Sequence, residues 1–97
     1  MNMRKLLKQA QEMQDRMQRE LGDTFVDASV GGGMVSIRMN GHKQLVSLKI
    51  EREIVDPEDP SMLEDLIVAA YNEGSRKMDD TLREKLSTMA AGMPRIL

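Results

Sequence analysis

The sequence contains no cysteine and no tryptophan, and it has only one phenylalanine and one tyrosine among its 97 residues. Because cysteine is absent, disulfide bonds, thiolate catalysis and cysteine-ligated zinc are excluded, which suits a reducing cytoplasm. The shortage of aromatic residues leaves the core without its usual large side chains, and ten methionines take their place. Methionine packs adaptably but specifies a unique core poorly. We therefore expect a thin fold that needs a second copy of the chain.

Long hydrophobic runs and a positive charge excess are also missing. No apolar run approaches the roughly 20 residues of a membrane span, and the chain is polar from Arg4 onward, so we expect neither a membrane helix nor a signal peptide. The net charge of −2 by itself argues against binding to nucleic acid. However, residues 51–65 hold seven acidic residues and one arginine, which leaves 13 basic and 9 acidic residues elsewhere. Two basic ends therefore flank an acidic middle.

Three runs of alternating apolar and polar residues occupy the middle of the chain. Such alternation predicts strands with one buried and one exposed face. The apolar positions are Val26, Ala28, Val30, Val35, Ile37, Met39, Val46, Leu48 and Ile50. Gly31–Gly33 allows a bulge or a wide turn, and Asn40-Gly41 predicts a type I′ hairpin turn, which needs positive φ at both central residues. We predict a three-stranded antiparallel meander over residues 24–51.

Residues 1–22 are predicted to form the first helix, which ends at Gly22. Its apolar residues recur at spacings of three and four, so they form a narrow stripe that resembles a coiled-coil seam. The stripe consists of Met3, Leu6, Leu7, Ala10, Met13, Met17 and Leu21. Two acid-before-base pairs have the i,i+4 spacing that stabilises a helix. These are Glu12–Arg16 and Asp15–Arg19.

A second helix is predicted over residues 57–90. Two Asp-Pro steps and a capping box place its start between Asp56 and Ser61. Its first half is apolar nearly all round, as in a helix that packs against a sheet. From Met78 onward only a thin apolar seam remains on a charged rod. About 28 residues span roughly 42 Å, so this helix should extend beyond a compact domain whose radius of gyration would be about 13 Å.

These elements predict a single α+β domain with the order α-β-β-β-α. Its parts are a helix over 1–22, a sheet over 24–51, a helix over 57–90 and a loose tail over 91–97, where Gly92 and Pro94 stop the helix. We expect a base made of the sheet and the first half of the second helix. The first helix and the end of the second helix would form an arm, with their thin seams covering each other.

No catalytic constellation emerges, and we expect no enzyme, no metal site and no cofactor. His42 is the only histidine and is interpreted as an exposed loop residue. Gly31–Gly33 could cradle a phosphate, but no Lys-Ser/Thr follows and no helix begins there, so turn geometry is favoured. Asp56, Glu58 and Asp59 could bind a hard cation, but their spacing is not that of an EF-hand, which favours a capped helix start.

Basic residues on the two helices are the remaining candidates for a site. One interpretation is a solvated surface, because Glu73–Lys77 and Asp79–Arg83 have the spacing of internal ion pairs. The other is that paired arms present cations to phosphates, which is salt-dependent and weakly sequence-selective binding. The candidates are Arg4, Lys5, Lys8, Arg16, Arg19, Arg76, Lys77, Arg83, Lys85 and, in the tail, Arg95. The first three lead, because they lack acid-first partners and form a basic tip.

Five segments carry a resemblance to a known family. They are Leu7–Met13 (Leu-Lys-Gln-Ala-Gln-Glu-Met), Gly31–Val35 (Gly-Gly-Gly-Met-Val), Asn40-Gly41, Val55–Asp59 (Val-Asp-Pro-Glu-Asp) and Met62–Asn72 (Met-Leu-Glu-Asp-Leu-Ile-Val-Ala-Ala-Tyr-Asn). With these segments in this order, the chain resembles the YbaB/EbfC family of bacterial nucleoid-associated proteins over essentially its full length. Where that family often carries a further glycine after the Asn-Gly turn, this chain has Lys43.

The resemblance implies a cytoplasmic, nucleoid-associated homodimer shaped like tweezers, with a joined sheet as its base and helical arms. It also implies DNA binding without a cofactor or catalysis, with an effect on gene expression or nucleoid organisation. We therefore expect the homodimer to grip the sugar-phosphate backbone of DNA through the basic residues named above. The alternative function is a protein-interaction module whose Met-rich arms hold a partner helix along the seam.

Overall fold

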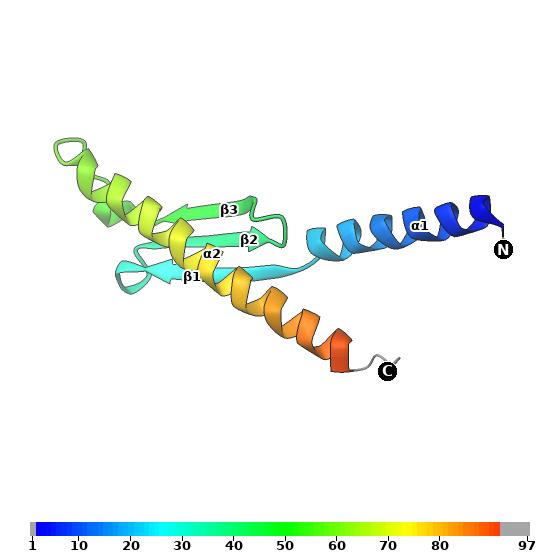
Figure 1. Ribbon diagram of the computed structural model, residues 1–97. Helices are drawn as coiled ribbons and strands as arrows, with labels where there is room; N and C mark the ends of the chain where they lie inside the picture. Colours follow the sequence, from blue (N-terminus) through cyan, green and yellow to red (C-terminus); the bar gives the residue numbers. More distant parts are fainter. Residues whose placement is uncertain (1, 92–97) are drawn as a thin grey trace.

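The computed structural model describes residues 2–91 and confirms the predicted α-β-β-β-α order (Figure 1). The predicted helix stop at Gly92 and Pro94, and Arg95 in the predicted tail, lie outside the described residues. The three strands form one antiparallel sheet in the order β1-β2-β3. The elements are α1 (Met3–Gly22), β1 (Phe25–Val30), the 3₁₀ turn η1 (Gly31–Gly33), β2 (Val35–Asn40), β3 (Leu45–Ile50), the 3₁₀ turn η2 (Arg52–Ile54) and α2 (Pro60–Ala91).

The core lies where α2 crosses one face of β1 and β2. Its buried apolar residues are Ala28, Val35, Ile37, Met39, Ala70 and Met78. Gly74 lets the helix approach the sheet closely, because a Cβ atom there would lie 2.5 Å from Cδ1 of Ile37. Met39 and Met78 are among the largest fully buried side chains. Methionine therefore fills the space between helix and sheet that an aromatic residue would often occupy.

The turn between β2 and β3 is not the predicted type I′ turn. Neither Asn40 nor Gly41 has a positive φ; the left-handed residue is Lys43, with φ 62°. The Asn40 carbonyl accepts a hydrogen bond from the Lys43 N–H at 2.9 Å, and the Asn40 side-chain oxygen accepts from the N–H groups of His42 and Gln44 at 3.0 Å each. The Asn40 side chain thus closes the turn by accepting two main-chain donors.

Gly41 is required because it has no side chain, and not because the turn needs a positive φ at this position. Its N–H donates to the carbonyl of Leu21 at 2.8 Å, and a Cβ atom at this position would lie only 2.5 Å from the same oxygen. Only glycine can therefore bring the hairpin so close to the last turn of α1. This contact fixes the end of α1 against the sheet.

The predicted alternation in β3 is wrong at Val46. A β-bulge between Arg38 and Met39 shifts the register, so that Leu45 rather than Val46 pairs with Met39. The predicted burial of β3 is also wrong, because Val46 and Leu48 are 53% and 45% exposed and only Ile50 of the three predicted positions is half-buried. The physical reason is that α2 packs against β1 and β2 and leaves the apolar side chains of β3 uncovered.

Helix α1 projects away from the rest of the chain and diverges from the second half of α2 (Figure 1). The radius of gyration is 19.2 Å, and the principal extents are 68 × 27 × 16 Å. A compact chain of this size would have a radius of gyration of about 13 Å. The prediction that the two seams cover each other is therefore wrong for the single chain, since Met13 on α1 is 64% exposed. The contact at Gly41 directs α1 away from α2.

Candidate nucleic-acid interface

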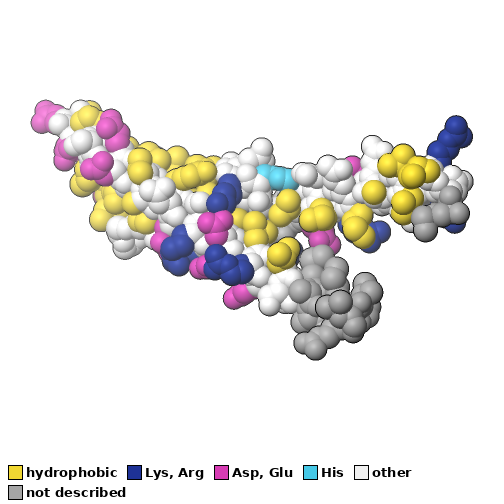
Figure 2. Space-filling model, in the orientation of Figure 1, with side chains coloured by type: hydrophobic (Ala, Val, Ile, Leu, Met, Phe, Trp, Pro, Cys, Tyr) yellow, Lys and Arg dark blue, Asp and Glu magenta, His cyan; other side chains and the backbone are white. Residues whose placement is uncertain are grey.

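The nine predicted DNA-binding residues within the described range fall into two groups, one on each helix. Arg4, Lys5, Lys8, Arg16 and Arg19 lie on α1, and Arg76, Lys77, Arg83 and Lys85 lie on α2. Figure 2 shows basic side chains at the free end of α1 and a second group over the middle of α2. All nine side chains are exposed, so burial alone does not distinguish the groups. Their hydrogen bonds and ion pairs do.

The cations on α1 have no carboxylate partners. Within residues 2–91 no ion pair involves α1, so the predicted pairs Glu12–Arg16 and Asp15–Arg19 do not form. The first turn of the helix contains no acidic residue, and Asn2 caps it by accepting the Arg4 N–H at 3.1 Å. Positive side chains and the positive end of the helix dipole therefore coincide at the free tip.

The arginines on α2 are engaged with carboxylates of the same helix. Arg76 bonds to Glu73 and lies 3.4 Å from Asp80, while Arg83 lies 3.3 Å from Asp80. The hydrogen bond from Arg76 lowers the pKa of Glu73 below its ordinary value, and the same bond raises the pKa of Arg76. A phosphate that approached these arginines would have to share them with carboxylates.

Two predicted ion pairs of α2 are replaced by contacts with the sheet and the hairpin. Lys77 donates to the main-chain carbonyl of Asp27 on β1 at 2.9 Å, and the predicted pair Glu73–Lys77 is not among the ion pairs of the described residues. Asp79 pairs with Lys43 of the hairpin at 2.7 Å, so the predicted pair Asp79–Arg83 does not form. Sequence reasoning missed the role of Lys43, for which the sequence carries no local signal.

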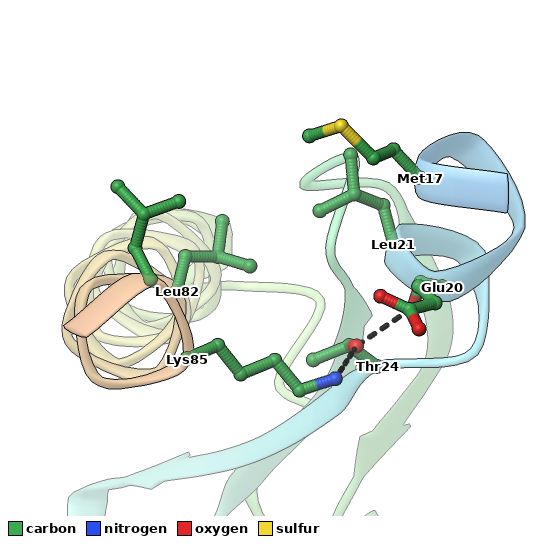
Figure 3. A pocket seen from close by; sticks show the side chains of 7 residues that line it. Met17, Glu20, Leu21, Thr24, Leu82 and Lys85 are labelled. Atoms are coloured by element: carbon green, nitrogen blue, oxygen red, sulfur yellow. Dashed lines mark hydrogen bonds between the residues drawn. The ribbon is translucent and has the colours of Figure 1, made fainter. Parts of the chain in front are cut away.

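The second half of α2 meets the end of α1 at a cavity of about 180 Å³. Its lining residues are Met17, Glu20, Leu21, Thr24, Leu82, Lys85 and Leu86. Lys85 reaches from α2 to Thr24, which lies between α1 and β1; the Lys85 Nζ donates to the Thr24 hydroxyl at 2.8 Å (Figure 3). Sequence reasoning also missed Thr24, because its partner is 61 residues away.

The other candidate sites have structural explanations. His42 is exposed, and its Nε2 lies 3.2 Å from the carbonyl of Gln18 in α1. The three glycines of η1 have φ values of 62°, 68° and 95°, which fits a turn between strands. In the acidic cluster, Asp56 accepts the Glu58 N–H at 2.9 Å just before α2 begins. Among the described residues, no group of three metal-ligating side chains comes together.

Neither helix of the described chain is both long and apolar enough to cross a membrane. Both of its long helices instead carry charged residues along their length, as the sequence shows directly.

Comparisons with known proteins find one family model, curated relatives and a solved structure that match this chain. A model of the YbaB/EbfC DNA-binding family matches residues 1–93. A nucleoid-associated protein of Koribacter versatilis is 41% identical over 92 residues, which cover 95% of this chain and 91% of that protein. Another from Syntrophobacter fumaroxidans is 45% identical over 87 residues, which cover 90% and 79% of the two chains. The crystal structure of an uncharacterized protein from Helicobacter pylori matches with a TM-score of 0.63 at 26% identity, covering 87% of this chain and 98% of that one.

Proposed function

Because this chain belongs to the YbaB/EbfC DNA-binding family, we propose that it is a homodimeric nucleoid-associated protein that grips DNA mainly through backbone phosphates. Such binding has low sequence specificity, because phosphates carry no sequence information. The protein acts at the nucleoid in the cytoplasm, where it contributes to nucleoid organisation or gene expression. The proposal includes no catalytic step and no cofactor.

The observation that carries the proposal is the basic tip, which consists of Arg4, Lys5 and Lys8. These side chains lie at the free end of a helix that projects from the domain, and they share it with no carboxylate. At physiological salt the Debye length is about 8 Å, so the acidic residues 51–65 at the other end of the domain are screened from the tip. A net charge of −2 for the whole chain is therefore compatible with a locally attractive arm.

The remaining candidate residues act as supporting contacts. Arg16 and Arg19 continue the basic surface toward the root of α1 without carboxylate partners. Lys77 and Lys85 each use one of three ammonium donors within the chain, which leaves donors for phosphate oxygens. Arg76 and Arg83 are shared with carboxylates and contribute least.

Dimerisation is supported by the uncovered apolar side chains of β3, an edge strand. Leu45, Val46 and Leu48 are all more than 40% exposed, and contiguous exposed apolar residues typically mark an interaction surface. Pairing of two β3 edges across a twofold axis would join the sheets and bury these side chains. Replacing Leu45 and Leu48 with Glu should then yield monomers in sedimentation velocity, whereas Leu86→Glu on the exposed surface of α2 should leave the dimer intact.

The DNA-binding proposal is tested by replacing the basic tip with glutamine. Each phosphate contact contributes about 0.9 to the slope of log affinity against log salt, so Arg4→Gln/Lys5→Gln/Lys8→Gln should lower that slope by up to about 2.7 for each protomer whose tip contacts the DNA. Affinity should fall similarly on unrelated duplexes in gel-shift titrations. Lys49→Gln/Arg52→Gln removes two cations from the far end of the sheet and serves as the control. Unchanged affinity in the triple variant would refute the assignment.

A second candidate function is favoured by the exposure of the methionine stripe on α1. Met3, Met13 and Met17 are uncovered in the described chain, and adaptable methionine surfaces suit partner helices. Under this alternative, Met13→Ser/Met17→Ser would abolish binding of a protein partner and leave DNA affinity unchanged. If a variant that stays folded loses DNA binding, the methionine stripe is instead required for DNA binding.

A further inference from the structure

One hydroxyl group joins the root of α1 to α2. Thr24 is only 7% exposed, and its hydroxyl donates to the carbonyl of Glu20 in the last turn of α1 at 2.7 Å. The same oxygen accepts a hydrogen bond from Lys85 Nζ at 2.8 Å. Figure 3 shows Lys85 extending from α2 across the gap to this junction. A threonine that donates to one helix and accepts from another couples the directions of the two.

The charge of Lys85 suits this position. The C-terminal end of a helix carries partial negative charge on its unpaired carbonyls, and a nearby cation stabilises it. Other donors complete the cap, because the N–H of Gly41 bonds to the Leu21 carbonyl and the N–H of Asp23 bonds to the Arg19 carbonyl. Lys85 therefore adds a second positive charge to that of Arg19, which lies in the last turn of α1.

Packing between the two helices does not replace this contact. The cavity of about 180 Å³ separates Met17 and Leu21 on α1 from Leu82 and Leu86 on α2. Met17 is 49% exposed, so its side chain does not fill the space. Because the apolar side chains do not interlock beyond the junction, the angle between the helices depends on two contacts at the root of α1: the packing of Gly41 against Leu21 and the polar contact of Thr24 with Lys85.

We propose that Lys85 and Thr24 are positioning residues that hold the angle between α1 and α2. In the proposed homodimer this angle sets the gap between the arms of the two protomers. The inference rests on the proposed function, because that gap matters only if the arms hold DNA. Without the Lys85–Thr24 bond, the Gly41 contact still holds the last turn of α1, but the helix samples a wider range of directions relative to α2. Only the fraction of molecules with a suitable gap then binds, and the apparent affinity falls by that fraction.

The direct test is a distance measurement without DNA. Because the chain has no cysteine, spin labels can be attached at Gln11→Cys on α1 and Ser87→Cys on α2, both exposed. If the labelled chain is refolded with a large excess of unlabelled chain, a dimer contains at most one labelled protomer. The measured distances then lie within one protomer. We expect a single narrow distance distribution in the parent, a broadened or shifted one in Lys85→Met and in Thr24→Val, and the parent distribution in Thr24→Ser, which keeps the hydroxyl.

DNA binding provides the second readout. Thr24→Val changes no charge, so a role in positioning predicts about tenfold weaker binding, if the competent fraction falls to about a tenth, with an unchanged salt slope. Thr24→Ser should restore the affinity. Lys85→Met should weaken binding at least as much as Thr24→Val does, because it also removes a supporting phosphate contact, and the double variant should be no weaker than Lys85→Met alone.

The possible outcomes separate the inference from the function. Unchanged distances in both Thr24→Val and Lys85→Met would overturn the positioning role, whether or not DNA binds. If Lys85→Met weakens binding with a reduced salt slope while Thr24→Val leaves affinity unchanged, Lys85 is only a phosphate contact, and the positioning role is also overturned. If the parent protein does not bind DNA, the proposed function fails, while the distance measurement still decides the inference. Thermal unfolding of each variant confirms that Thr24→Val folds.

Discussion

Replacing Gly41 with alanine should destabilise the protein far more than the same substitution does at an ordinary turn glycine. The added Cβ would lie 2.5 Å from the Leu21 carbonyl oxygen and 2.9 Å from the Leu21 Cα. Relief requires the hairpin and α1 to separate, which breaks the hydrogen bond from Gly41 to Leu21. A lost hydrogen bond costs about 0.5–1.5 kcal/mol and overpacking about 1–3 kcal/mol, so the free energy of unfolding should fall by about 2–4 kcal/mol.

A second substitution separates this explanation from a turn requirement. If Gly41 were needed for a left-handed backbone, asparagine would be tolerated better than alanine, because asparagine adopts that conformation more readily. If the close approach to Leu21 is the reason, the larger asparagine should be at least as costly as alanine. Urea unfolding at one fixed protein concentration measures both variants, since the stability of a dimer depends on concentration.

Gly22→Ala is the matched control. A Cβ atom at this position meets only His42 Nε2, at 3.9 Å, and Gly22 is the last residue of α1. Alanine there should stabilise the fold by about 0.4–1 kcal/mol, by reducing the entropy of the unfolded chain. The reasoning is refuted if the free energy of unfolding of Gly41→Ala lies within about 0.5 kcal/mol, or roughly one RT, of the parent value. It is also refuted if Gly41→Asn is clearly milder than Gly41→Ala.

Three further predictions concern the hairpin, the core and the surface of α2. Lys43→Gly should be more stable than Lys43→Gln by about 1 kcal/mol in urea unfolding, because both lose the ion pair to Asp79 but only glycine relieves the left-handed backbone. Met39→Ala should lower the free energy of unfolding by about 2–5 kcal/mol, since Met39 is fully buried between sheet and helix. Arg76→Gln should raise the pKa of Glu73 toward 4.5 in an NMR titration, because the hydrogen bond that lowers it is lost.

The predictions for Lys43 and Met39 each have a control. Equal stability of the two Lys43 variants would mean that the backbone at this position carries no strain. Met13→Ala, on the exposed stripe of α1, should change monomer stability by less than about 0.5 kcal/mol, and a loss as large as that of Met39→Ala would contradict the burial argument.

Because the folded pKa of Glu73 is lowered, its contribution to stability is present at neutral pH and is lost as pH falls through that pKa.

Local patterns predicted the elements of this fold well. Alternation at Val35, Ile37 and Met39 identified a buried strand, because the period of a strand is visible in a few residues. The same pattern failed at Val46, since the β-bulge depends on pairing with another strand. The Asn40-Gly41 signal located the hairpin correctly but not its geometry, because the contact of Gly41 with Leu21 lies outside the turn.

The candidate site was predictable in position but not in its contacts. The basic tip follows from the sequence, because Arg4, Lys5 and Lys8 have no acidic residue four positions before them. The partners of Lys77 and Lys85 lie 50 and 61 residues away, so no rule based on helical spacing could find them. The direction of α1 was also hidden, because it depends on the contacts of Gly41 and Thr24. The DNA-contacting role of the basic residues on both helices stays a prediction.

The hydrogen bond from Lys77 to the Asp27 carbonyl bears on how many copies can assemble. A three-stranded sheet has two borders at which further strands could add, and a lysine on one border discourages such addition. Lys77 of this chain's own helix occupies the Asp27 carbonyl on the β1 border, which leaves β3 as the more accessible border. If two copies pair along β3 as proposed, each β1 border that remains carries this lysine contact. Further addition of strands is then disfavoured, which favours a closed pair over a fibre.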